Sequence, residues 1–126
     1  MQNNNLKFKT DLKSRAYRYA IDIIQFINVL DKRDFSVQII SRQLLRSATS
    51  IGANLIEAQA GSTKKDFTNF FNHALKSANE SKFWLGLLRD TNKADKARVN
   101  ELLAETGELA NMIGASILTL KGKRKL

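Results

Sequence analysis

Cysteine and proline are both absent from this 126-residue chain, and histidine occurs once, as His73. Without cysteine the protein has no disulfide, no thiolate nucleophile and no thiolate metal ligand, which fits a reducing compartment. With a single histidine and no Glu-x-x-His pair, the zinc and di-iron sites of helical bundles are unsupported. The lack of proline favours long uninterrupted helices, because proline is the residue that most strongly breaks them.

Long apolar runs and nucleotide-binding loops are missing as well. No run approaches the roughly 20 apolar residues of a membrane span, and the first nine residues lack the apolar core of a signal peptide. No glycine-rich phosphate-binding pattern occurs. Glu57 and Glu80 could form a carboxylate pair if their side chains met, but structural hydrogen bonding is the favoured interpretation. We therefore expect a cytoplasmic protein with no enzymatic activity, catalytic residue, cofactor or metal ion.

Positive charge is in excess, with 21 basic and 12 acidic residues and a net charge of +9. Six of the nine excess charges lie at the two chain ends, residues 1–10 and 121–126, which we expect to be flexible. These ends can contact nucleic acid or another polyanion, or they can merely solubilise a domain that binds neither. No helix-turn-helix, basic zipper or RNA-recognition signature is present, so contacts would be mainly with backbone phosphates. The candidate contact residues are Lys13, Arg15, Arg18, Arg42, Arg46, Lys64, Lys65, Lys76, Lys121, Lys123, Arg124 and Lys125.

Apolar residues recur at steps of three and four through four segments, which is the period of an amphipathic helix. The links between the segments are short, and no tandem repeat or second domain is visible. The pattern predicts one all-α domain over residues 1–126, an antiparallel up-down-up-down four-helix bundle. We expect Glu101, Glu105 and Glu108 to point outward from the fourth helix, so that the basic field lies away from it. The predicted helices cover residues 11–31, about 36–60, about 64–90 and about 93–121.

The limits of these helices are predicted from capping residues. A short polar side chain before the first turn accepts a free N–H, and a glycine after the last turn ends a helix. Gly52 lies inside the second helix, where glycine costs about 1 kcal/mol relative to alanine, so we predict a close approach of another helix there. The predicted caps are Asp34 or Ser36 and Gly61 for the second helix, Thr63–Asp66 for the third, and Thr91–Asn92 and Gly122 for the fourth.

Small polar residues follow the apolar stripe of the second helix, and a similar polar stripe runs along the third. Small side chains let two helices approach closely, and their hydroxyl, amide and carboxylate groups can hydrogen-bond across the contact. We hypothesise that the two stripes are partly buried, either between these helices or at a subunit contact. The residues concerned are Ser47, Ser50, Asn54 and Glu57 on the second helix, and Ser77 and Glu80 on the third.

Several large apolar residues flank the predicted core positions. They are Tyr17, Ile21, Phe70, Phe83 and Trp84. Exposed aromatic and aliphatic bands usually mark interfaces, so we expect a homo-oligomer. The alternative is a wide core that absorbs these side chains within one chain.

Two stretches resemble the motifs of a family of small bacterial four-helix-bundle proteins. The first is Gln43-Leu-Leu-Arg-Ser-Ala-Thr-Ser-Ile-Gly-Ala-Asn-Leu-Ile-Glu57, and the second is Ala74-Leu-Lys-Ser-Ala-Asn-Glu-Ser-Lys-Phe-Trp-Leu85. The family includes proteins encoded in intervening sequences of 23S rRNA genes, once labelled ribosomal proteins. The chain departs from many relatives where Ala58 follows Glu57 in place of glycine, which moves the glycine that ends the helix to Gly61.

The resemblance implies a four-helix bundle and assigns catalysis to no residue. The family is similar to the accessory variability determinant subunit of diversity-generating retroelements, a basic homopentamer that binds nucleic acid and a reverse transcriptase. It therefore implies an oligomer, with the pentamer as one such state, and a role with RNA or DNA. The motif positions coincide with the two polar stripes of the second and third helices; they are Arg46, Ser47, Ser50, Asn54, Glu57, Ser77 and Glu80.

Two functions from different classes follow. The first is a basic oligomeric protein that binds rRNA, or another structured RNA or DNA, through phosphate contacts. The second is an adaptor between proteins whose basicity is incidental. The first predicts binding that weakens with salt, and the second predicts a specific acidic or apolar protein partner and no nucleic-acid binding at physiological salt.

Overall fold

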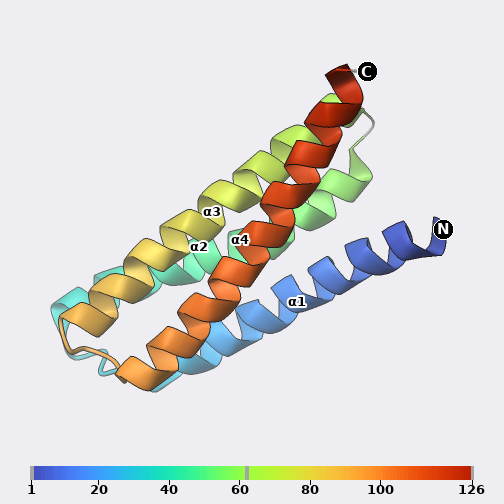
Figure 1. Ribbon diagram of the computed structural model, residues 1–126. Helices are drawn as coiled ribbons and strands as arrows, with labels where there is room; N and C mark the ends of the chain where they lie inside the picture. The colour runs from blue at the N-terminus through green and yellow to red at the C-terminus, as the bar shows by residue number, and fades with distance from the viewer. Residues whose placement is uncertain (1, 62, 126) are drawn as a thin grey trace.

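The computed structural model describes the backbone of residues 2–61 and 63–125, and the side chains of residues 11–61 and 63–122. All regular structure in this part of the chain is α-helical, and the helices form a four-helix bundle (Figure 1). This confirms the predicted fold class. The helices are α1 (Gln2–Asn28), α2 (Phe35–Ala60), α3 (Lys64–Asp90) and α4 (Lys96–Lys125). Over the described residues, none of them is long and apolar enough to cross a membrane.

Contacts between neighbouring helices run in opposite directions along the chain. Between α2 and α3, Arg46 pairs with Glu80 and Ser50 with Ser77. Between α1 and α4, Tyr19 meets Thr106, and Arg15, one turn earlier in α1, reaches Met112, which lies later in α4. As a result, the start of α1, the link from α2 to α3 and the end of α4 all lie at one end of the bundle (Figure 1).

The core consists of the inward stripes that the periodicity predicts. Leu44, Leu85, Leu109 and Ile113 are each fully buried. At the end of α1, Phe26 is 4% exposed and points inward, whereas the neighbouring Ile27 is only half-buried. Phe26 continues the buried row because it lies three residues after Ile23 and four before Leu30, which are both buried.

Two predicted helix starts are confirmed. Asp34 Oδ1 accepts the Val37 N–H at 3.2 Å and caps α2. Thr63 Oγ1 accepts the Asp66 N–H at 3.1 Å and caps α3. The end of α2 lies at Gly61 as expected, but for a different reason.

Gly61 has φ −66° and ψ 142°, so it does not use the left-handed conformation usual for a glycine after a helix. Instead, the turn leaves little room for a side chain. A Cβ atom at this position would lie 3.2 Å from the Ala58 carbonyl oxygen and 3.3 Å from the Asp66 Cβ.

The predicted start of α4 at Thr91–Asn92 is wrong, because these residues close α3. Asn92 has φ 59°, its N–H binds the Arg89 carbonyl oxygen at 3.1 Å, and the Lys93 N–H binds the Leu88 carbonyl oxygen at 2.9 Å. Asparagine is one of the few residues that adopt this left-handed conformation readily. The first turn of α4 is held by a different residue, Asp95, whose Oδ2 accepts the Arg98 N–H at 2.9 Å.

The outer limits of the first and last helices also differ from the prediction. α1 begins at Gln2 instead of residue 11, and α4 continues through Gly122 to Lys125. A glycine inside a helix costs only about 1 kcal/mol, and the described glycines all have negative φ, so Gly122 does not act as a stop. The side chains of Lys123, Arg124 and Lys125 lie outside the described part of the chain.

Candidate nucleic-acid interface

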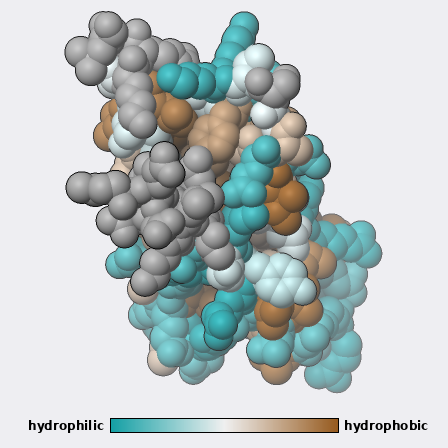
Figure 2. All heavy atoms as spheres, turned by 90° about the vertical axis from the view of Figure 1, so that its right-hand side faces the viewer, coloured by the Kyte–Doolittle hydropathy of each residue, from teal (hydrophilic) through white to brown (hydrophobic). Residues whose placement is uncertain are grey.

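Basic residues gather at the end of the bundle where α1 begins, α2 is linked to α3 and α4 ends. We call this the basic end and define it as residues 2–13, 57–61, 63–66 and 114–125. It carries nine lysines and arginines and three acidic residues. The opposite end of the bundle, residues 25–41 and 85–101, carries six basic and five acidic residues. Figure 2 looks onto this side, where hydrophilic side chains surround smaller hydrophobic patches. The fold thus brings together three basic segments that lie far apart in the sequence.

Among the predicted contact residues whose side chains the structure describes, six are exposed and not held by a carboxylate. They are Arg18, Arg42, Lys64, Lys65, Lys76 and Lys121. Within the described part of the chain, none of these six forms an ion pair. Lys13 donates a hydrogen bond to Gln59 Oε1 at 2.7 Å, a neutral partner that leaves its charge uncompensated. Lys13, Lys64, Lys65 and Lys121 belong to the basic end.

Arg15 and Arg46 are held by carboxylates of neighbouring helices. Arg15 Nη2 lies 2.8 Å from Glu105 Oε1, and Arg15 Nε lies 3.2 Å from Glu105 Oε2. This hydrogen-bonded pair raises the pKa of Arg15. Arg46 pairs with Glu80. Their compensated charges make these two arginines weaker candidates for phosphate contact than the six exposed cations.

The prediction that three glutamates point outward from α4 is correct for Glu101 and Glu108, which are exposed. It is wrong for Glu105, which is half-buried against α1 and neutralises Arg15. Glu108 also helps to raise the pKa of Arg15. The middle of α4 therefore carries acidic side chains next to α1, whereas the basic residues of this helix lie toward its two ends.

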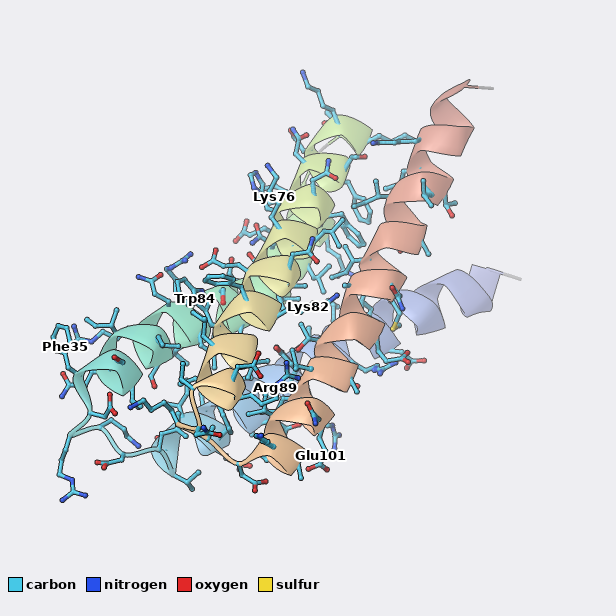
Figure 3. The ribbon with its side chains drawn as sticks, turned by 60° about the vertical axis from the view of Figure 1, so that its left-hand side comes forward. Phe35, Lys76, Lys82, Trp84, Arg89 and Glu101 are labelled. Atoms are coloured by element: carbon cyan, nitrogen blue, oxygen red, sulfur yellow. The ribbon has the colours of Figure 1, made fainter. Side chains whose placement is uncertain are left out.

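The polar stripes lie between α2 and α3, as hypothesised. Ser50 Oγ is 3.1 Å from Ser77 Oγ, and Asn54 donates to the Ser50 carbonyl oxygen within α2 at 2.8 Å. Trp84 Nε1 donates to Glu80 Oε2 at 2.9 Å, on the side of α3 that faces α2 (Figure 3). Glu57 is exposed and takes no part in the contact. These residues fix the register of α2 against α3 within one chain.

Sequence reasoning placed Ser47 in the polar stripe of α2, and its hydroxyl does bond to α3, but the other three buried hydroxyls at the centre of the bundle, those of Tyr19, Ser81 and Thr106, were missed. Ser47 Oγ is 2.8 Å from Ser81 Oγ, and Tyr19 Oη is 2.7 Å from Thr106 Oγ1. Burial raises the pKa of Tyr19 to about 12, and hydrogen bonds with Thr106 and Ser81 oppose this rise. All four helices thus contribute one hydroxyl. The sequence did contain a signal for this pair, since Tyr19 and Thr106 both lie on inward stripes. A buried hydroxyl needs a hydrogen-bond partner, so two inward hydroxyls could have been predicted to bond to each other.

The opposite face of α3 meets α4 through polar contacts of another kind. Figure 3 shows Lys82 and Arg89 on this side of α3, and Arg89 Nη1 donates to Asn100 Oδ1 at 2.9 Å. Nowhere in the described part of the chain do three His, Cys, Asp or Glu side chains gather closely enough to hold a metal ion. The arrangement can therefore attract anions.

The fold and its charge distribution define a small helical bundle with one strongly basic end. The model of the 23S rRNA-intervening sequence protein family matches residues 9–115, and the chain belongs to this family. It is similar to a crystal structure of a protein of unknown function from the S23 ribosomal protein family of Bacteroides thetaiotaomicron VPI-5482. The identity is 31%, the TM-score is 0.80, and the match covers 87% of this chain and 97% of that one. No curated protein matches the chain.

Proposed function

We propose that this protein is a non-enzymatic cytoplasmic four-helix-bundle protein that binds nucleic acid through phosphate contacts at its basic end. The observation that carries the proposal is the gathering of nine basic residues there against three acidic ones. A cluster of this kind attracts polyanions and raises the rate at which they associate. Membership of the 23S rRNA-intervening sequence protein family makes a structured RNA such as rRNA the favoured ligand.

The exposed cations support contact with phosphates and not with base edges. Lys64 and Lys65 lie in the first turn of α3, and Lys121 lies near the end of α4. Lysine is a flexible point charge that binds a phosphate without selecting a base. Binding should therefore depend strongly on salt and weakly on sequence, because each neutralised phosphate releases counterions.

A salt titration tests this function. The full chain is titrated with a structured RNA and with duplex DNA, next to the double variant Lys64→Gln/Lys65→Gln. The matched control, Arg33→Gln/Lys96→Gln, removes two charges from the opposite end. If both lysines contact phosphates, the slope of log affinity against log salt falls by roughly 0.7–0.9 for each lost contact, and the control keeps the slope of the unaltered chain. Absence of binding to both polymers at about 0.1 M salt contradicts the proposed function.

A chain that ends at Leu120 adds a second arm to this titration. It lacks Lys121, Lys123, Arg124 and Lys125. A shallower slope for this chain places contacts on the end of α4. An unchanged slope moves them to the start of α3 and to α1.

An adaptor between proteins is the second candidate, and exposed apolar side chains favour it. Val29, Phe35 and Leu118 are each more than two thirds exposed. An adaptor would bind a specific acidic or apolar protein and no nucleic acid at physiological salt. The titration above separates the two functions.

We also propose that copies of this chain associate. Large apolar side chains that stay exposed on all four helices support this, because monomers rarely leave extended apolar bands in water. The resemblance to the accessory retroelement subunit makes a pentamer the assembly to test first. Sedimentation equilibrium over a range of concentrations gives the mass, and a monomer at all of them contradicts this part of the proposal.

A further inference from the structure

An open groove of about 700 Å³ runs along α1, with Ile56 of α2 at its side, and an aromatic ring lines it. Tyr17 contributes this ring and is 70% exposed, the largest exposure of any described aromatic residue except Phe35. Ile21 and Ile56 add apolar side chains from the two helices. A flat ring beside aliphatic side chains gives a planar apolar group a surface on which to stack.

Two cations flank the ring. Lys13 lies one helical turn before Tyr17 and Arg18 directly after it, and both line the groove. Arg18 is exposed and has no ion-pair partner among the described residues, and Lys13 binds only the neutral Gln59. Proteins that bind single strands combine an aromatic stacking surface with such cations along the backbone path.

The groove is also directional. Asp22 lines it one turn beyond Arg18 and repels phosphates from that part, whereas Lys13 belongs to the basic end. A strand whose phosphates meet Lys13 and Arg18 is therefore led toward the basic end and away from Asp22. Ser14 and Gln25, also in the groove, can donate to or accept from the edge of a base.

We propose that this groove binds an unpaired base of a single-stranded nucleic acid segment, stacked on Tyr17, with Lys13 and Arg18 on the adjoining phosphates. The inference rests on the proposed function and adds the kind of ligand at this point. A base inside a duplex already stacks on its neighbours, so the ring gains nothing from double-stranded nucleic acid. Single-stranded loops, bulges and ends of a structured RNA present the bases that fit.

Equilibrium binding by the full-length chain tests the inference with three nucleic acids. They are a single-stranded oligouridylate, an RNA duplex of the same length, and a matched oligomer without bases. The variants are Tyr17→Leu, which removes the ring but keeps an apolar side chain, and Tyr17→Phe, which keeps the ring. Phe83→Leu is the matched control, because Phe83 is 58% exposed on α3, away from the groove. Sedimentation gives the mass of every variant.

We expect Tyr17→Leu to weaken binding of the oligouridylate about tenfold, since stacking of one base on an aromatic side chain is commonly worth that much. Duplex affinity and the salt slope stay unchanged, and Tyr17→Phe and Phe83→Leu bind as the unaltered chain does. The oligomer without bases binds the unaltered chain about as weakly as the oligouridylate binds Tyr17→Leu.

Equal affinities of Tyr17→Leu and the unaltered chain for the oligouridylate overturn the inference, and so does an equal loss for the duplex. A smaller assembly mass for Tyr17→Leu also overturns it, because the groove is then a contact between copies. If the unaltered chain binds structured RNA or duplex and only the Tyr17 effect is missing, the proposed function survives. If the unaltered chain binds none of these polymers, both fail.

Discussion

The Tyr19 hydroxyl lies at the centre of the bundle, where a polar group is stable only when it is hydrogen-bonded. Its side chain is 1% exposed. The Thr106 hydroxyl donates to the Leu102 carbonyl oxygen at 2.6 Å, so its single proton is used and the Tyr19 hydroxyl is the donor in their shared bond. One residue of α1 is thereby tied to one particular turn of α4.

Tyr19→Phe removes this hydrogen bond without creating a cavity. We expect the free energy of unfolding to fall by about 1 kcal/mol, the usual net contribution of one buried hydrogen bond. Tyr17→Phe serves as the control and should change stability by less than about 0.5 kcal/mol, because Tyr17 is exposed. Urea denaturation measures both. Equal stabilities of Tyr19→Phe and the unaltered chain would contradict a stabilising role for the hydroxyl.

The raised pKa of Tyr19 also predicts how stability depends on pH. The folded value is about 12 and the ordinary value is 10. Between these values the unfolded chain loses the phenolic proton and the folded chain keeps it. The stability linked to Tyr19 is therefore complete below about pH 10 and is lost as the pH rises toward 12.

The full size of this loss is about 3 kcal/mol, because each of the two pKa units corresponds to about 1.4 kcal/mol. It appears as the difference between the pH profiles of the unaltered chain and Tyr19→Phe, which share their other titrating groups. Urea denaturation at several pH values between 9 and 12 measures the two profiles. Profiles that stay parallel over this range would show that Tyr19 titrates normally in the folded protein.

At the scale of the helices, the approach of α1 to α2 at Gly52 is close but does not require glycine. A Cβ atom placed on Gly52 would lie 3.6 Å from the Ala16 Cβ, an ordinary contact distance. The close approach of the two helices that we predicted from this glycine is present. It does not depend on the glycine, however, because the helices would have room for a Cβ atom at this position.

Gly52→Ala should accordingly raise the free energy of unfolding by up to about 1 kcal/mol, because alanine has the higher helix propensity. Gly52→Leu should lower it, since a larger side chain would displace Ala16. Thermal and urea unfolding of the two variants measure the effects. Destabilisation by alanine would mean that α1 and α2 pack more tightly in solution.

Sequence periodicity was sufficient to predict the helices, because each inward stripe repeats over about four to six turns. Helix ends were harder to predict, and Asn92 shows why. Asparagine is favoured both before a helix and after one, so the segment around Asn92 does not reveal which helix it serves. Arg15 shows the corresponding limit for the site, since its partner Glu105 is 90 positions away and no local pattern connects them.

At the scale of the whole molecule, the up-down topology converts a scattered charge pattern into a segregated one. Lys64 and Lys65 are near the middle of the sequence, yet they share an end of the bundle with Lys13 and Lys121. Like charges held together repel one another in the folded state. Salt screens this repulsion over distances of about 10 Å at 0.1 M.

The midpoint of thermal unfolding should therefore rise with added sodium chloride. The rise should be smaller for Lys64→Gln/Lys65→Gln than for Arg33→Gln/Lys96→Gln, because only the first variant relieves the crowded end. Scanning calorimetry at several salt concentrations measures the midpoints. Equal salt dependence of the two variants would contradict a destabilising charge cluster at the basic end.

An even number of helices places both termini of this chain on the same side, next to the cluster of lysines. A purification tag or fluorescent protein fused to either terminus would lie next to the surface that we propose binds a polyanion. It could mask an interaction or, if it is itself charged, imitate one. The turns at 29–34 and 91–95 lie at the opposite end of the bundle. A reporter group attached there does not block the access of a polyanion to the basic end.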